Sequence, residues 1–151
     1  MLVRPDCGPL VSPPASDDGF FGDRYGSVLD PFGHLWAIVT VKEELSPEEI
    51  HRRMAEMTWA WVDGLRAKHG DAFGILAGEG RRTPTVTSIT IPPTFTASTL
   101  VKAVAERGFT IGNGYGKNRE TTFRIGHMGD HSPERLKVCL ESCGEVIEQL
   151  V

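Results

Sequence analysis

Apolar positions in the first third of the chain repeat first with the period of a strand and then with that of a helix. Residues 24–29 and 34–41 predict two strands, joined by Asp30-Pro31-Phe32-Gly33, which has the residue types of a type I turn. A long helix is predicted from Ser46-Pro47-Glu48-Glu49, where an N-cap serine, a proline at N1 and a glutamate at N3 coincide. The helix is expected to end before Gly70, and its apolar stripe comprises Ile50, Met54, Met57, Trp61, Val62 and Leu65.

From residue 71 onward the pattern becomes strand, strand, helix, strand, strand, helix. The strands are predicted at residues 73–77, 85–91, 109–111 and 121–125, and the helices at 97–107 and from Ser132-Pro133-Glu134 onward. This order predicts an α+β domain, a small antiparallel or mixed sheet with helices on one face, preceded by the β-hairpin and the long connecting helix. The buried face of the last helix should comprise Leu136, Cys139, Leu140, Cys143, Ile147 and Leu150.

Composition limits the function classes. Of the 151 residues, 40% are hydrophobic and 24% are charged, which is typical of a soluble globular protein. No segment approaches the roughly 20 apolar residues of a membrane helix, and the N-terminus does not resemble a secretory signal, so we expect a cytoplasmic protein without membrane contact. Residues 1–18 are rich in Pro, Gly, Ser and Asp without periodicity, and we expect a disordered tail there.

The net charge of −4 argues against nucleic-acid binding, because affinity for phosphates comes from clustered Lys and Arg. The pair Arg81-Arg82 is too short to form a basic patch and is expected in a solvated turn. The odd count of three cysteines, Cys7, Cys139 and Cys143, does not indicate a disulfide framework. Cys139 and Cys143 are one helical turn apart, and each is expected to be a small buried apolar residue.

Two further patterns resemble ligand sites, but their surroundings argue against that role. Gly112, Gly114 and Gly116 resemble a phosphate loop, but no helix follows to direct its N-terminus at a phosphate, so we expect a mobile hairpin loop. His127 and His131, with Asp130 between them, invite a metal site that includes a cysteine. Glycines and a proline around them indicate a loop rather than a helix face, and we predict no metal site.

Four motifs between residues 58 and 151 resemble the C-terminal small domain of class V aminotransferases. They are Thr83-Pro84-Thr85-Val86-Thr87-Ser88-Ile89, Val104-Ala105-Glu106-Arg107-Gly108-Phe109, Gly112-Asn113-Gly114-Tyr115-Gly116 and Phe123-Arg124-Ile125-Gly126-His127-Met128-Gly129. The resemblance implies that Arg124 binds the α-carboxylate of a small amino-acid or keto-acid substrate, since a guanidinium offers a planar pair of donors. Spacing alone, without the resemblance, favours a strand arginine in a surface ion pair over this role for Arg124.

In this family the cofactor pyridoxal phosphate is held by a larger domain through a lysine. The five lysines here, Lys42, Lys68, Lys102, Lys117 and Lys137, lie in no segment that resembles the cofactor-lysine loop. We therefore expect no catalytic residue, no cofactor bound by this chain alone and no stand-alone transaminase activity. A large domain supplied in trans would be needed.

A second resemblance covers residues 19–56. Gly22-Asp23-Arg24-Tyr25-Gly26 and Asp30-Pro31-Phe32-Gly33-His34-Leu35-Trp36 are similar to the end of a glyoxalase/bleomycin-resistance domain. The two resemblances together imply a fusion of truncated parts: a tail (1–18), a glyoxalase-like fragment (19–56) and an aminotransferase class V C-terminal domain (57–151). Two alternatives remain, a non-catalytic module that forms homo-oligomers and a glyoxalase-like protein that acts as a metal-binding dimer.

Overall fold

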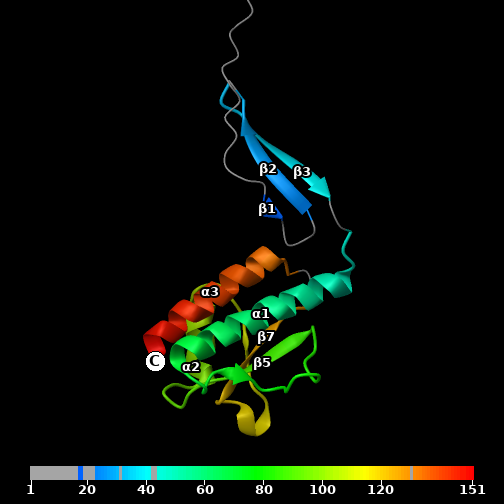
Figure 1. Cartoon of the computed structure of the whole chain (residues 1–151). Helices are drawn as coiled ribbons and strands as arrows, with labels where there is room; N and C mark the ends of the chain where they lie inside the picture. The colour runs from blue at the N-terminus through cyan, green and yellow to red at the C-terminus, as the bar shows by residue number, and fades with distance from the viewer. Residues whose placement is uncertain (1–16, 19–22, 31, 42–43, 130) are drawn as a thin grey trace, which may run out of the picture. The chain divides into compact units, whose positions relative to one another are not determined.

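The computed structural model describes residues 17–18, 23–30, 32–41, 44–129 and 131–151. The chain divides into two compact units, Met1–Ser46 and Pro47–Val151. Figure 1 shows the elements of each unit. In the described part of the chain, no helix has the length and apolar character that crossing a bilayer requires.

The first unit is a three-stranded antiparallel sheet in the order β1-β2-β3, formed by β1 (Asp17–Asp18), β2 (Asp23–Leu29) and β3 (Leu35–Val41). The hairpin β2–β3 confirms the predicted pair of strands. The expectation of a disordered tail is corrected at Asp17–Asp18, which pair with Tyr25 and Arg24 of β2. Strand pairing uses backbone groups, and the free edge of β2 offers them whatever the side chains are. The rest of the tail, residues 1–16, lies outside the described residues.

The Asp30 carboxylate organises the hairpin turn. Its Oδ1 accepts hydrogen bonds from the backbone N–H groups of Phe32 and His34, both at 2.9 Å. Its Oδ2 accepts one from Trp36 Nε1 at 3.0 Å and lies 3.0 Å from His34 Nδ1. Gly33 has a φ of 87°, and its N–H donates to the Asp30 carbonyl at 3.0 Å. The turn is therefore fixed by an aspartate at its first position and a glycine at its last, as predicted; Pro31 lies outside the described residues.

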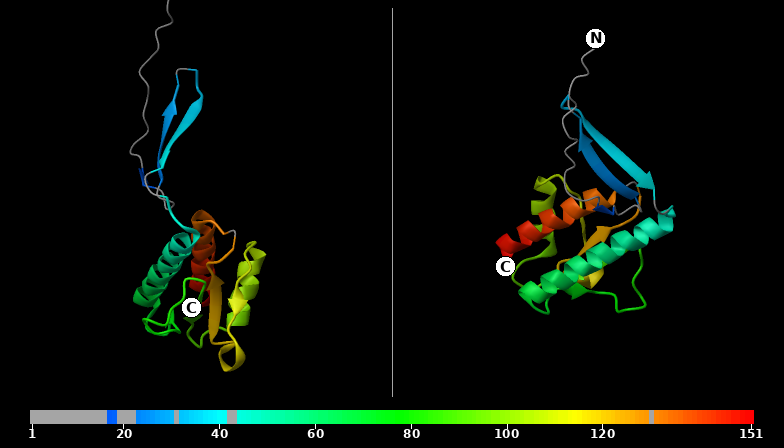
Figure 2. Two further views of the ribbon diagram at one scale, coloured as in Figure 1. Left: turned by 90° about the vertical axis from the view of Figure 1, so that its right-hand side faces the viewer. Right: turned by 45° about the horizontal axis from the view of Figure 1, so that its top comes forward.

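The second unit has two layers. Its sheet has the order β4-β5-β7-β6, and every neighbouring pair is antiparallel: β4 (Gly74–Ile75), β5 (Val86–Thr90), β7 (Thr122–Gly126) and β6 (Gly112–Asn113). The helices are α1 (Pro47–His69), α2 (Ala97–Glu106) and α3 (Pro133–Leu150). α1 contacts β4 and β5, α2 contacts β6 and β7, and α3 contacts both helices; its packing beside α1 is visible in Figure 2.

Alternate residues of the two central strands face the helices. Thr87 and Ile89 of β5 and Phe123 and Ile125 of β7 are buried, whereas Val86 is exposed on the other face. The predicted α+β class, with helices on one face of a small antiparallel sheet, is confirmed. The opposite face carries no helix among the described elements and is the open face of the sheet.

The packed face of α1 differs from the predicted stripe. Met54, Val62 and Leu65 are buried as expected, but Ile50, Met57 and Trp61 are only half-buried. Ala55 and Thr58 are buried in their place. α1 contacts both the sheet and α3, so small side chains on the line between these surfaces become enclosed while large ones at the margin stay partly exposed.

The strand predicted at residues 109–111 is wrong, because β6 is instead Gly112–Asn113. The pairing with β7 is anchored beyond it at Gly114, whose N–H donates to the Thr122 carbonyl at 2.7 Å. A Cβ at Gly114 would lie 2.0 Å from Thr122 Oγ1 and 2.3 Å from the Asn118 carbonyl oxygen. This approach is open only to glycine, and it fixes which residues of the two strands face each other.

Candidate functional site

Arg124 lies at the centre of β7 and points to the open face of the sheet. Its pairing partners are Ser88 of β5 and Gly112 of β6. Its sequence neighbours Phe123 and Ile125 are buried toward the helices, and side chains alternate along a strand, so Arg124 emerges on the other side. Arg124 itself is half-buried.

Three residues of the β6–β7 hairpin hold the guanidinium plane. Arg124 Nε donates to the Asn113 carbonyl at 2.7 Å. The guanidinium carbon lies 3.8 Å from the ring centroid of Tyr115, which is the stacking distance of a cation–π contact. A Cβ at Gly112 would lie 3.1 Å from Arg124 Nη2, so glycine leaves the space that the side chain crosses.

This arrangement leaves the terminal amino groups of Arg124 available. No carboxylate of the described residues forms an ion pair with Arg124, although most other arginines of the second unit have one. With Nε occupied by a carbonyl, a carboxylate can approach end-on and accept two parallel hydrogen bonds from the two Nη groups. The site can therefore bind a carboxylate without rearranging the arginine.

The supporting residues Gly112, Asn113 and Tyr115 were not predicted as site residues. They lie in the run that carries the resemblance, but their contact with Arg124 depends on the register between two strands. The signal available in the sequence was a lone tyrosine between two glycines, Gly114-Tyr115-Gly116, and in the structure its ring is 74% exposed.

His127 and His131, considered together for a metal, occupy different environments. His127 is fully buried, and neither of its ring nitrogens has a hydrogen-bond partner of good geometry among the described residues. Burial lowers the pKa of His127 to about 4, and His51 acts in the same direction while the backbone of Pro84 opposes it. His131 is exposed, and Asp130 lies outside the described residues. Within the described ranges no group of three or more His, Cys, Asp or Glu residues is arranged to hold a metal ion.

Both cysteines of α3 are free thiols. Cys143 is buried as predicted, whereas Cys139 is half-buried. The neighbouring Cys143 thiol lowers the pKa of Cys139, and Cys139 together with burial raises the pKa of Cys143. Cys139 is therefore the more reactive of the two; Cys7 lies outside the described residues.

No family model matches the chain. A 2-aminoethylphosphonate–pyruvate transaminase of Bacteroides fragilis is 33% identical over 99 residues, which are 65% of this chain and 26% of that protein. An uncharacterized protein of Mycobacterium bovis is 44% identical over 41 residues, 27% of each chain. The chain thus spans about a quarter of the length of the curated relatives that it matches.

Several solved structures with a similar fold are also aminotransferases. An alanine–glyoxylate aminotransferase of Nostoc matches 64% of this chain and 25% of its own, with a TM-score of 0.57 and 19% identity. A phosphoserine aminotransferase of Cytophaga hutchinsonii matches 67% and 26%, with a TM-score of 0.56 and 19% identity. The chain contains an aminotransferase-like fold. An aspartate aminotransferase of Thermus thermophilus, matching 65% of this chain and 27% of its own at a TM-score of 0.52 and 22% identity, agrees with this conclusion.

Aminotransferases are typically dependent on pyridoxal phosphate, but the described residues do not form a site for it. Lys68 pairs with Glu148 at 2.6 Å on the surface. Lys102, Lys117 and Lys137 are exposed, and none of them is among the residues that line three cavities in the described part of the chain. Lys42 lies outside the described residues. The cofactor requires a lysine in a cavity, beside groups that bind its phosphate. The described residues do not bring such a lysine and such groups together.

Proposed function

We propose that residues 57–151 are the C-terminal small domain of a class V aminotransferase, which binds the carboxylate of an amino-acid or keto-acid substrate through Arg124. The order of the four sequence motifs supports the class, and the aminotransferase-like fold is consistent with it. The activity would also require a large domain that holds pyridoxal phosphate, because the described residues bring no lysine into a cofactor site.

The main support for this proposal is that the two terminal amino groups of Arg124 are available to a ligand. A strand arginine with a structural role is expected to pair with an acid, yet the described residues provide only the Asn113 carbonyl and the Tyr115 ring. These contacts orient the guanidinium without neutralising it. A planar cation held in place on an open face is the arrangement that recognises a carboxylate rather than the arrangement of an ordinary surface ion pair.

We further propose that residues 19–56 descend from a glyoxalase/bleomycin-resistance domain. The junction then lies inside α1, near Met57-Thr58. The boundary between the compact units is instead at Ser46–Pro47, so the first turns of α1 pack with the second unit. A fusion inside one amphipathic helix allows this, because the apolar stripe continues through the junction and can bury against the new partner.

The carboxylate site can be tested by an NMR chemical-shift titration with pyruvate. Wild type should show saturable shifts at Arg124 and at the backbone N–H groups of Gly112 and Asn113. Arg124→Ala should abolish them, and Arg124→Lys should weaken binding about tenfold, because a single ammonium cannot reproduce the two parallel hydrogen bonds. Arg119→Ala is the matched control, since Arg119 is an exposed arginine of the same hairpin whose contact is with Glu120 at 3.6 Å. Equal shifts in wild type and Arg124→Ala would refute the assignment.

Self-association is a second candidate, favoured by apolar side chains left in solvent. Leu76 is 50% exposed and Val86 is 38% exposed, both beside the open face of the sheet, and Tyr115 lies in the loop of the same sheet. Exposed apolar groups gathered in one region commonly mark an interface. Light scattering at micromolar and millimolar protein concentrations tests it, and a monomer at both would remove this function.

A further inference from the structure

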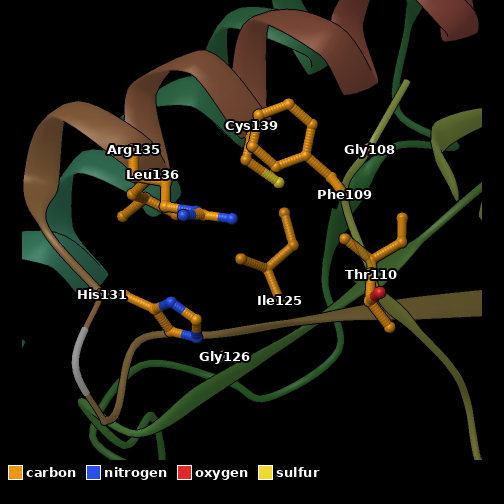
Figure 3. A pocket seen from close by; sticks show the side chains of 10 residues that line it. Gly108, Phe109, Thr110, Ile125, Gly126, His131, Arg135, Leu136 and Cys139 are labelled. Atoms are coloured by element: carbon orange, nitrogen blue, oxygen red, sulfur yellow. The ribbon is translucent and has the colours of Figure 1, made fainter.

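The second unit contains a cavity that the carboxylate site does not use. It has a volume of about 330 Å³ and lies between the first turns of α3, the segment 108–111 and the end of β7. Figure 3 shows Arg135, Cys139 and Ile125 pointing into one space from α3 and β7. This volume is at the lower end of ligand-binding pockets, which measure about 300–1,000 Å³.

The cavity exists because two strands separate. The β6–β7 pairing stops at Gly112, although a continued register would place Thr110 opposite Gly126. His127 N–H bonds the Thr85 carbonyl at 2.8 Å, and bonding directions alternate along a strand, so the N–H and C=O of Gly126 point toward the cavity side. No backbone hydrogen bond joins Thr110 to Gly126 among the described residues. The cavity is therefore bordered by a short strand edge whose donor and acceptor point toward it.

Two basic side chains lie around this edge. Arg135 and His131 line the cavity together with Thr110, and no carboxylate of a described residue does. Arg135 forms no ion pair with any described residue. The neighbouring Glu134 does not line the cavity but an adjoining hollow, which shares Gly108, Phe109 and Arg135 with it. The walls are apolar and come from Phe109, Ile125 and Leu136. The Arg135 cation at the rim, an amide N–H directed toward the cavity and an apolar interior fit a ligand that is anionic at one end and apolar at the other.

We propose that this cavity binds a small organic acid, with its carboxylate between Arg135 and the Gly126 N–H and its apolar body against Phe109, Ile125 and Leu136. The site is separate from the Arg124 site, because Ile125 and Arg124 are consecutive residues of β7 and point to opposite faces of the sheet. The two sites can therefore be occupied or disabled independently.

Cys139 provides a readout that needs no enzymatic activity. It lines the cavity and is half-buried, whereas Cys143 is buried behind it. The rate at which iodoacetamide alkylates Cys139 can be measured peptide by peptide with mass spectrometry, which also separates it from Cys7. A ligand in the cavity covers this thiol and slows its alkylation.

The experiment compares phenylacetate with its uncharged analogue phenylacetamide on the full chain. Phenylacetate should slow alkylation of Cys139 saturably, by fivefold or more, while phenylacetamide has little effect. In Arg135→Gln the concentration for half-protection should rise about tenfold, as expected for the loss of one charge-assisted hydrogen bond. Lys137→Gln removes an exposed cation of the same helix outside the cavity and should leave protection unchanged.

The outcomes distinguish this site from the Arg124 site. Protection that survives Arg124→Ala but weakens in Arg135→Gln supports the proposal, whether or not pyruvate binds at Arg124. Protection that is lost in Arg124→Ala places the ligand on the open face and overturns it. Absence of saturable protection at millimolar phenylacetate, or equal protection by phenylacetamide, overturns it as well.

Discussion

The buried His127 predicts that the second unit loses stability in weak acid. Its pKa is lowered to about 4 in the folded chain, against an ordinary value of 6.5. The unfolded chain therefore binds the proton more readily, and protonation between these values favours unfolding. The contribution of the neutral ring is complete above about pH 6.5 and is lost as the pH falls toward 4. A difference of two to three pKa units corresponds to about 3 kcal/mol at 1.36 kcal/mol per unit.

Urea unfolding measured at intervals from pH 7 to pH 4 tests this prediction. The circular-dichroism signal of the helices is the appropriate probe, because every helix of the described residues belongs to the second unit. His127→Phe keeps a flat ring in the buried position and removes the titrating group. The free energy of unfolding of the wild type should fall by up to about 3 kcal/mol more than that of the variant over this range.

Other groups also titrate between pH 7 and pH 4, so the effect of His127 is measured as the difference between the wild type and the variants. His131→Gln is the matched control, because His131 is exposed and lies four residues away. It should retain the full acid sensitivity of the wild type. If His127→Phe loses stability with pH as steeply as the wild type does, then the burial of His127 is not the source, and the reasoning is refuted.

Four further substitutions test the hairpins, α1 and the arginine. Gly114→Ala should cost more than about 3 kcal/mol in thermal or urea unfolding, because its Cβ would lie 2.0 Å from a hydroxyl, whereas Gly64→Ala, with nothing within 4 Å, should stabilise α1 by about 1 kcal/mol. Gly112→Ala should displace the Arg124 guanidinium, whose Nη2 would lie 3.1 Å from the new Cβ, and weaken pyruvate binding severalfold with little change in melting temperature. Asp30→Ala should remove the hydrogen bonds of the N-terminal turn, seen as loss of amide dispersion in the hairpin and an upfield shift of the one indole N–H that Asp30 accepts from.

Features that depend on local sequence were predicted well. The start of α1 at Pro47, its end before Gly70 and the hairpin turn at Asp30 each follow from a few adjacent residues. Gly70 has a φ of 96°, and its N–H donates to the Arg66 carbonyl at 2.9 Å, as a residue that ends a helix should. Helix ends and tight turns are determined within a few residues, so a sequence shows them directly.

Features that depend on pairing between distant segments were not predicted. The run Phe109-Thr110-Ile111 has the residue types of a strand, yet it does not pair with β7 and instead borders a cavity. The pairing of Asp17–Asp18 with β2 uses only backbone groups, so no pattern of side chains predicts it. The partners of Arg124 come from a neighbouring strand for the same reason. Propensity describes a segment, whereas a register describes two segments together.

Both candidate sites depend on one register, that between β6 and β7. Gly114 fixes it, because the tight contact with Thr122 forms at one alignment only. That alignment places Gly112 beneath the Arg124 guanidinium on the open face and ends the pairing where the chain turns away from Gly126. A slip of one residue would invert the faces of β6 relative to β7, replacing Gly112 under the arginine by a residue with a side chain. The glycine pattern that resembles a phosphate loop therefore acts by setting a strand register, and the geometry of both sites follows from it.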